Sequence, residues 1–194
     1  MKKKREDIFP LSHTKCIYGS RHLVRQKVLQ ILTAIEVSNA DLESVFEHIF
    51  YRDFNFDDIE TEKDKLLTQE QILEIESDTP IIWRDDDIDF AKKLIQSTIS
   101  IKDEVQQYIQ EITEHWSIER ISLIDKILIE MAVAEFVSFP EIPVKVSISE
   151  AMEIGKIFST DKSAQFINGI LDKILLILKD KNKINKIGRG LIDS

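Results

Sequence analysis

The chain has 194 residues and a mass of 22.5 kDa, with 43% hydrophobic and 31% charged residues. This composition supplies a core for one medium domain or two small ones, and the net charge of −9 excludes a uniformly basic nucleic-acid coat protein. The single Cys16 excludes an internal disulfide framework and a multi-cysteine zinc site. No apolar run reaches the roughly 20 residues that span a bilayer, and no secretory signal pattern follows the basic start, so we expect a cytoplasmic protein.

The charge is divided unevenly along the chain. Residues 1–30 carry eight basic and two acidic side chains (+6), residues 31–100 carry six and eighteen (−12), and residues 101–194 carry twelve and fifteen (−3). A basic end on an acidic body indicates a polyanion site near the N-terminus. For the Lys-Lys-Lys-Arg run at residues 2–5 alone, a solvated tail is the simpler interpretation, so residues 1–19 are assigned to a flexible basic extension.

Helical periodicity organises the first half of the chain. Ser20 precedes apolar residues that recur every three or four positions over 24–35, which predicts an amphipathic helix. A second short helix is predicted over about 41–51, with these residues facing inward: Leu42, Val45, Phe46 and Ile49. The acidic stretch 52–80 contains only a short helical pattern. Residues 20–82 are therefore expected to form an N-terminal helical subdomain with an acidic insertion.

Apolar residues are densest in the second half. Two amphipathic helices are predicted, over about 86–100 and 105–116. A third is predicted over 118–136, with Ser117 as its N-cap. Because its apolar residues occupy more than one face, this helix is expected to be central and buried.

Two further helices complete the expected fold. Ser147 and Glu150 match a capping box that is predicted to open a helix ending at Phe158, and an amphipathic helix follows Lys162. No long period-two alternation is present, which predicts an all-α bundle of six to eight helices. Residues 83–180 are assigned to a C-terminal helical bundle and 181–194 to a flexible basic tail.

The motifs of common catalytic and metal sites are absent from the sequence. The four histidines lack metal-ligand spacing, and there is no P-loop, nucleophile elbow or glycine-rich phosphate cradle. The acidic run from Asp85 to Asp89 is better interpreted as a helix start than as a cation site. We therefore expect a noncatalytic protein without a metal or cofactor.

The first candidate binding group is Arg21, His22 and Arg25, at the start of the first strong helix. Arg21 and Arg25 are four residues apart and share a face, where their charge meets the positive end of the helix dipole at a cost of a few tenths of a kcal/mol. Such guanidinium groups favour an external anion, for example RNA phosphate or a base edge. The alternative is that they are ordinary surface arginines beside an apolar stripe.

The second candidate group lies at the start of the last helix. It comprises Lys162, Gln165, Phe166 and Asn168. Asn168 suits a base edge or a neighbouring backbone, and Phe166 suits either base stacking or core packing. Gly169 costs roughly 1 kcal/mol in a helix relative to alanine, which predicts close approach of another helix or a ligand there.

Three stretches of the sequence resemble the NusB family of transcription antitermination factors, over roughly residues 20–38 and 84–178. The first is the arginine-bearing helix that begins Arg21-His-Leu-Val-Arg25. The second is Trp116-Ser-Ile-Glu-Arg120-Ile-Ser-Leu-Ile-Asp125-Lys. The third and most specific joins Ile142-Pro143-Val-Lys-Val-Ser-Ile-Ser-Glu150-Ala151 to Gln165-Phe166-Ile-Asn168-Gly169-Ile-Leu-Asp172-Lys173.

The resemblance implies two small helical bundles packed together. It also implies binding of boxA-type RNA jointly with the small-subunit ribosomal protein that doubles as Nus factor E, in a complex that acts on elongating RNA polymerase in ribosomal RNA operons. By position, Arg21, His22 and Arg25 match the family's RNA-binding helix. The last-helix region near RNA is matched by Lys162, Gln165, Phe166 and Asn168.

The sequence also departs from the family pattern. Ser20 and Leu23 stand where arginine is common, and Glu130 stands where arginine is usual. The substitutions at Ser20 and Leu23 keep open a protein-only scaffold that has lost RNA binding. A second alternative is a helical RNA-binding accessory domain of an rRNA methyltransferase system, since the resemblance extends to the helical domain that some of these enzymes carry. Apolar helix faces also allow a homodimer.

Overall fold

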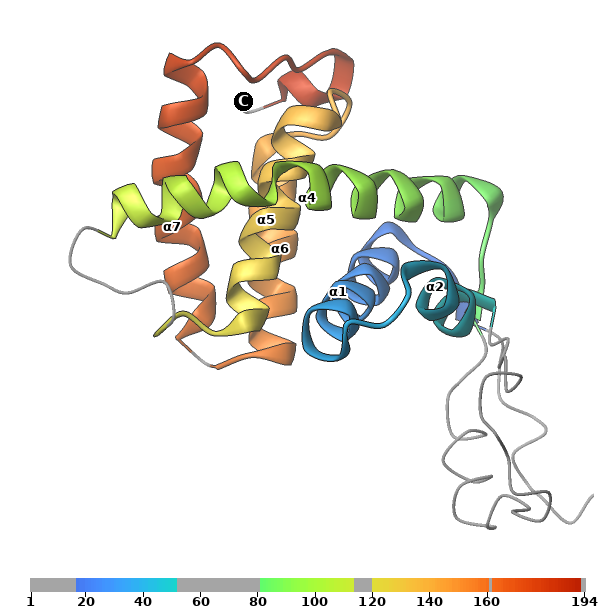
Figure 1. Ribbon diagram of the computed structural model, residues 1–194. Coiled ribbons are helices and arrows are strands. Elements are labelled where there is room, and N and C mark those ends of the chain that lie inside the picture. Colours follow the sequence, from blue (N-terminus) through green and yellow to red (C-terminus); the bar gives the residue numbers. More distant parts are fainter. Residues whose placement is uncertain (1–16, 52–80, 114–119, 161, 193–194) are drawn as a thin grey trace, which may run out of the picture.

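Helices make up nearly all of the computed structural model, which describes residues 17–51, 81–113, 120–160 and 162–192 (Figure 1). Within these ranges there are six α-helices: α1 (Arg21–Ser38), α2 (Leu42–Tyr51), α4 (Asp85–Ile112), α5 (Leu123–Ser138), α6 (Val144–Phe158) and α7 (Ser163–Asp180). A 3-10 turn, η3 (Gly188–Leu191), and two short strands, β1 (Ile17–Tyr18) and β2 (Ile81–Ile82), complete the described structure. The predicted all-α class is confirmed.

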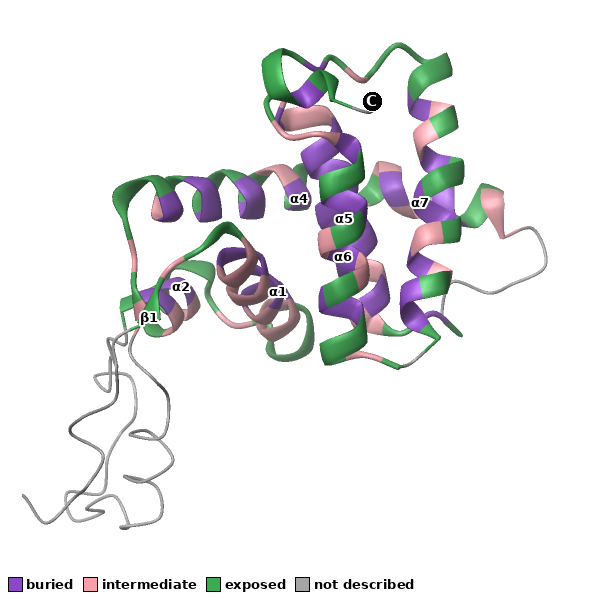
Figure 2. Cartoon of the chain, turned by 180° about the vertical axis from the view of Figure 1, so that it is seen from behind, coloured by how far each residue is buried: buried purple, intermediate pink, exposed green. Residues whose placement is uncertain are grey.

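Helix α5 lies at the centre of the fold and packs on α1, α4, α6 and α7. Every residue from Ile127 to Phe136 is buried. Figure 2 shows buried segments, in purple, where α4, α5, α6 and α7 meet. The prediction of a central buried helix is therefore confirmed, but α5 begins later than expected. Its N-cap is Ser122, whose hydroxyl accepts a hydrogen bond from the Asp125 amide at 3.0 Å. The predicted cap, Ser117, lies outside the described residues.

Helix α4 belongs to two groups of helices (Figure 1). Its N-terminal part packs on α1 and α2, and its C-terminal part on α5 and α7. The prediction of separate helices over 86–100 and 105–116 was wrong, because α4 is continuous for 28 residues. No glycine or proline interrupts residues 100–105, and the buried face continues from Thr98 to Val105.

The start of α1 is fixed by a short parallel pairing of β1 with β2, in which Ile17 pairs with Ile81. Ser20 then caps α1 by accepting a hydrogen bond from the Leu23 amide at 3.2 Å. Two-residue strands are too short to show the alternation that reveals a strand in a sequence. As a result, Ile17 was assigned to the flexible extension although it pairs with β2.

Helix α2 packs on α1 and buries two aromatic side chains, Phe46 and Phe50, whose rings stack at 4.6 Å. Of the residues predicted to face inward, Phe46 is buried while Val45 and Ile49 are half-buried. Leu42 is 38% exposed, so its assignment to the inward face was wrong.

The capping-box prediction for α6 was also wrong. Pro143 occupies the N-cap, because its fixed backbone angle suits a helix start and its missing N–H costs nothing there. Ser147 therefore lies inside α6, and its hydroxyl donates to Glu135 Oε2 at 2.5 Å. Glu150 faces α1 rather than its own helix start.

The chain after α7 returns to the turn between α5 and α6. The Ile187 amide donates to the Pro140 carbonyl at 3.0 Å, and the buried Lys186 Nζ donates to two backbone carbonyls. At Gly190 a Cβ atom would lie 1.9 Å from Pro140 O, so only glycine fits. Within the segment assigned to a flexible basic tail, residues 186–190 thus lie against the α5–α6 turn. Among the helices that the structure describes, none is both long and apolar enough to cross a membrane.

Candidate nucleic-acid interface

Arg21 is the first residue of α1 and its side chain is exposed. Its Nη1 donates to the backbone oxygen of Asp86 at 2.8 Å, and its Cζ lies 4.3 Å from the centroid of the Phe90 ring. The first turn of α1 holds no acidic residue. A guanidinium carries five N–H donors, so Arg21 keeps donors for an external anion while the ring fixes its plane.

His22 is half-buried between α1 and α6. Its Nδ1 lies 2.8 Å from Glu150 Oε2, and its Nε2 lies 3.0 Å from Gln26 Nε2. If the Gln26 amide donates to Nε2, then Nδ1 carries the proton that is donated to Glu150. With one-third of its side chain exposed, the His22 ring borders the surface at which Arg21 stands.

Arg25 lies in the interior, with 5% of its surface exposed. Its Nε and Nη2 donate to the two carboxylate oxygens of Glu135 at 2.6 and 3.0 Å, and Glu150 Oε2 lies 3.6 Å from Nη1. Burial alone would lower the pKa of Arg25, but the charge and hydrogen bonds of Glu135 raise it above its ordinary value. In this structure Arg25 therefore joins α1 to α5 in the interior and exposes little surface to a strand, while its RNA contact stays a prediction.

Glu135 is the residue that sequence reasoning missed. It is 2% exposed and joins three helices, because it accepts hydrogen bonds from Arg25 of α1 and Ser147 of α6 while belonging to α5. Its backbone oxygen also accepts a hydrogen bond from Lys186. A carboxylate within the mostly apolar second half of α5 was the available signal, since buried acids need a partner.

The second candidate group stands at the start of α7. Lys162 and Gln165 are exposed, Phe166 packs partly against the core, and Asn168 Nδ2 donates to Asp172 Oδ2 at 3.0 Å. Helix α7 packs on α4, α5 and α6, whereas α1 packs on α2, α4 and α5. The two candidate groups therefore lie on separate helices rather than in one cluster.

Gly169 does not serve the predicted close approach within the described chain. A Cβ atom there would have no neighbour within 4 Å. The close approach falls instead at Gly155 of α6, where a Cβ atom would lie 2.8 Å from Ile167 Cδ1.

The acidic run after Trp83 starts α4, as predicted. Arg84 Nε and Nη2 donate to the Asp87 carboxylate at 3.0 and 3.2 Å, and these bonds lower the pKa of Asp87. The carboxylate is buried. Within the described ranges, no three histidine, cysteine or acidic side chains are grouped as a metal ion requires.

These features define an all-helical protein of two packed groups sharing one long helix. A family model described as the NusB family matches residues 22–176. The transcription antitermination protein NusB of Chloroherpeton thalassium is 32% identical over 174 residues, covering 90% of this chain and 70% of that protein. That of Salinibacter ruber is 45% identical over 104 residues, covering 54% of this chain and 65% of that protein. The chain belongs to the NusB family, and it spans about two thirds of the length of these curated relatives.

Solved structures agree with this assignment. A structure of T. maritima NusB has a TM-score of 0.59 at 25% identity and covers 81% of this chain and 92% of that chain. A complex of antitermination factors NusB and NusE with dsRNA has a TM-score of 0.58 at 17% identity and covers 81% of this chain and 96% of that chain. At this identity the second match shows the fold alone.

Proposed function

We propose that the chain is a noncatalytic transcription antitermination factor that binds boxA-type RNA together with the small-subunit ribosomal protein known as Nus factor E. The assembly acts on elongating RNA polymerase in ribosomal RNA operons, which places the protein in the cytoplasm. Membership of the NusB family supports this function, as does the RNA in the complex of a structural neighbour.

The observation that carries the proposal is the placement of Arg21. Its guanidinium is exposed at the positive end of α1, and no acidic residue of the first turn offsets its charge. The start of α4 offsets part of this charge, because Arg21 donates to the Asp86 backbone oxygen and its charge acts on the Asp87 carboxylate. The donors that remain free suit an RNA phosphate. His22 extends the same surface. On α7 the proposed contacts are Lys162, Gln165, Phe166 and Asn168.

Joint binding follows from the charge of the protein. The net charge of −9 disfavours RNA over most of the surface, so a few cationic contacts give weak binding alone. A basic ribosomal protein is attracted to the acidic body, and two linked weak contacts gain from effective concentration.

The test measures binding of a boxA-type RNA oligonucleotide to the full chain, with and without the ribosomal protein, against an RNA of scrambled sequence. We expect specific binding that the ribosomal protein strengthens. Equal binding of the two RNAs, or no response to the ribosomal protein, contradicts the proposal. Sedimentation of the same samples reports whether the free chain is a homodimer.

A protein-only scaffold is the second candidate, and the burial of Arg25 favours it. With Ser20 and Leu23 replacing arginine, Arg21 is the remaining exposed arginine in the described part of α1. If the chain binds the ribosomal protein but no RNA, the scaffold is supported over the RNA-binding antitermination factor.

A further inference from the structure

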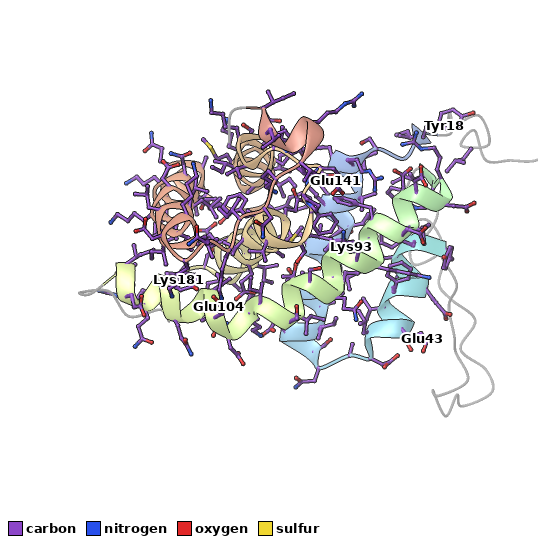
Figure 3. All side chains as sticks on the ribbon, turned by 90° about the horizontal axis from the view of Figure 1, so that it is seen from above. Tyr18, Glu43, Lys93, Glu104, Glu141 and Lys181 are labelled. Atoms are coloured by element: carbon purple, nitrogen blue, oxygen red, sulfur yellow. The ribbon has the colours of Figure 1, made fainter. Side chains whose placement is uncertain are left out.

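A second exposed cation lies near Arg21, on the neighbouring helix. Lys93 is exposed on α4, and its Nζ lies 4.3 Å from the centroid of the Phe139 ring (Figure 3). Phe139 itself is 1% exposed. The lysine side chain therefore crosses a buried ring and presents its ammonium group at the surface next to the turn between α5 and α6.

Two aromatic rings connect this lysine to Arg21. Phe90 and Phe139 meet edge to face, with centroids 5.3 Å apart and an interplanar angle of 75°. Arg21 lies over Phe90 as Lys93 lies over Phe139. Successive steps of 4.3, 5.3 and 4.3 Å place the two cationic groups within about 14 Å of each other. Neither forms an ion pair with a carboxylate among the residues that the structure describes.

We propose that Arg21 and Lys93 form one phosphate-binding surface across α1 and α4, on which a single RNA strand runs from the tip of α1 towards the α5–α6 turn. This inference rests on the proposed function and adds Lys93 to it. The rings hold both cations in place, so little side-chain entropy is lost when phosphates bind. Exposed carboxylates lie beside this surface: Asp85, Asp86 and Asp89 belong to α4, and Glu141 lies in the α5–α6 turn. They disfavour phosphates at positions away from the two cations.

Lys92 provides a matched control on the same helix. It is adjacent in sequence and equally exposed, but its Nζ lies 5.6 Å from the Phe46 ring of α2. Lys92 also lines the apolar groove between α2 and α4, away from Phe139. Replacing either lysine by alanine removes the same charge from the same helix, so only position differs.

The experiment measures the affinity of a boxA-type RNA, with the ribosomal protein present, for wild type, Lys93→Ala and Lys92→Ala over a range of salt concentrations. We expect Lys93→Ala to weaken binding and to flatten the slope of log K against log salt by about 0.7, the value for one lost single-strand phosphate contact. Lys92→Ala should leave the affinity within a factor of two of wild type and the salt slope unchanged. Lys93→Arg should restore binding.

The outcomes separate this inference from the proposed function. Wild type that does not bind the RNA overturns both. If wild type binds the RNA and Lys93→Ala binds it with the same affinity and salt slope, the shared surface is overturned and the proposed RNA-binding function is not. Equal losses in Lys93→Ala and Lys92→Ala also overturn it, because they reveal a general effect of net charge.

Discussion

Arg25 of α1 and Glu135 of α5 form a two-point ion pair in the protein interior, with N···O distances of 2.6 and 3.0 Å. The two residues are 110 positions apart in the chain. This pair joins the helix that carries Arg21 and His22 to the central helix of the fold. The orientation of the candidate RNA-binding surface is therefore set from inside the protein.

Removing one partner of this pair should destabilise the protein rather than change its RNA contacts. Arg25→Ala leaves Glu135 charged and buried, which costs about 3–5 kcal/mol of unfolding free energy. Urea denaturation measures the loss. Ser147→Ala, which removes one hydrogen bond to Glu135, is the control and should cost about 1 kcal/mol. Unchanged stability together with a flatter salt dependence of RNA binding would restore the direct role that the sequence predicted for Arg25.

Arg21→Ala should have the opposite profile. Because the side chain is exposed, we expect the unfolding free energy to change by no more than about 0.5 kcal/mol. RNA binding should weaken, and its salt slope should flatten by about 0.7. Titration of labelled RNA at several salt concentrations measures both. A large loss of stability with an unchanged slope would assign Arg21 to the structure instead.

The sequence predicts those parts of the fold that depend on neighbouring residues. The recurrence of apolar residues after Ser20 predicts α1, and the all-round apolar pattern of α5 predicts the buried helix. Ser147 shows the limit of such reasoning. Its spacing from Glu150 fits a capping box, yet Pro143 starts the helix and both side chains bond to other helices.

The candidate site was predicted only in part, for the same reason. A spacing of four residues correctly places Arg21 and Arg25 on one side of α1, but it does not reveal which side chains face them. Arg21 meets the start of α4 and stays exposed, while Arg25, one turn deeper, meets Glu135. Lys93 was overlooked because the Phe139 ring that supports it is distant in sequence.

Glu130 should make stability depend on pH. It is 4% exposed, and burial raises its pKa although Gln106 donates a hydrogen bond to it. The folded state therefore keeps this proton to higher pH than the unfolded state, so its contribution to stability falls as pH rises through the raised pKa. We expect Glu130→Gln to stabilise the protein at pH 7, with a smaller gain in acid. Denaturation at pH 5 and 7 tests this, and a gain independent of pH would contradict it.

Lys186 should make the unfolding free energy depend on pH in the alkaline range. Burial lowers its pKa from 10.5 to about 8, against the opposing charges of Glu135 and Glu141. Between these pH values the unfolded chain binds a proton that the folded state lacks, so stability rises with pH by up to about 1.4 kcal/mol per unit. The neutral amine still has two hydrogens for its two carbonyl partners. The difference in unfolding free energy between wild type and Lys186→Met should therefore grow from pH 8 to 10, and a constant difference would refute it.

Gly169→Ala should stabilise the free protein. The residue lies within α7, and a Cβ atom there meets nothing within 4 Å. Alanine should therefore gain about 1 kcal/mol from helix propensity, measured as a higher midpoint of thermal unfolding. Gly155→Ala is the contrasting variant, because its Cβ would lie 2.8 Å from Ile167 Cδ1 and that crowding offsets the gain. If Gly169→Ala is stabilised but loses binding of RNA or of the ribosomal protein, a partner occupies the open space beside Gly169. If binding is unchanged, no partner contacts α7 at Gly169.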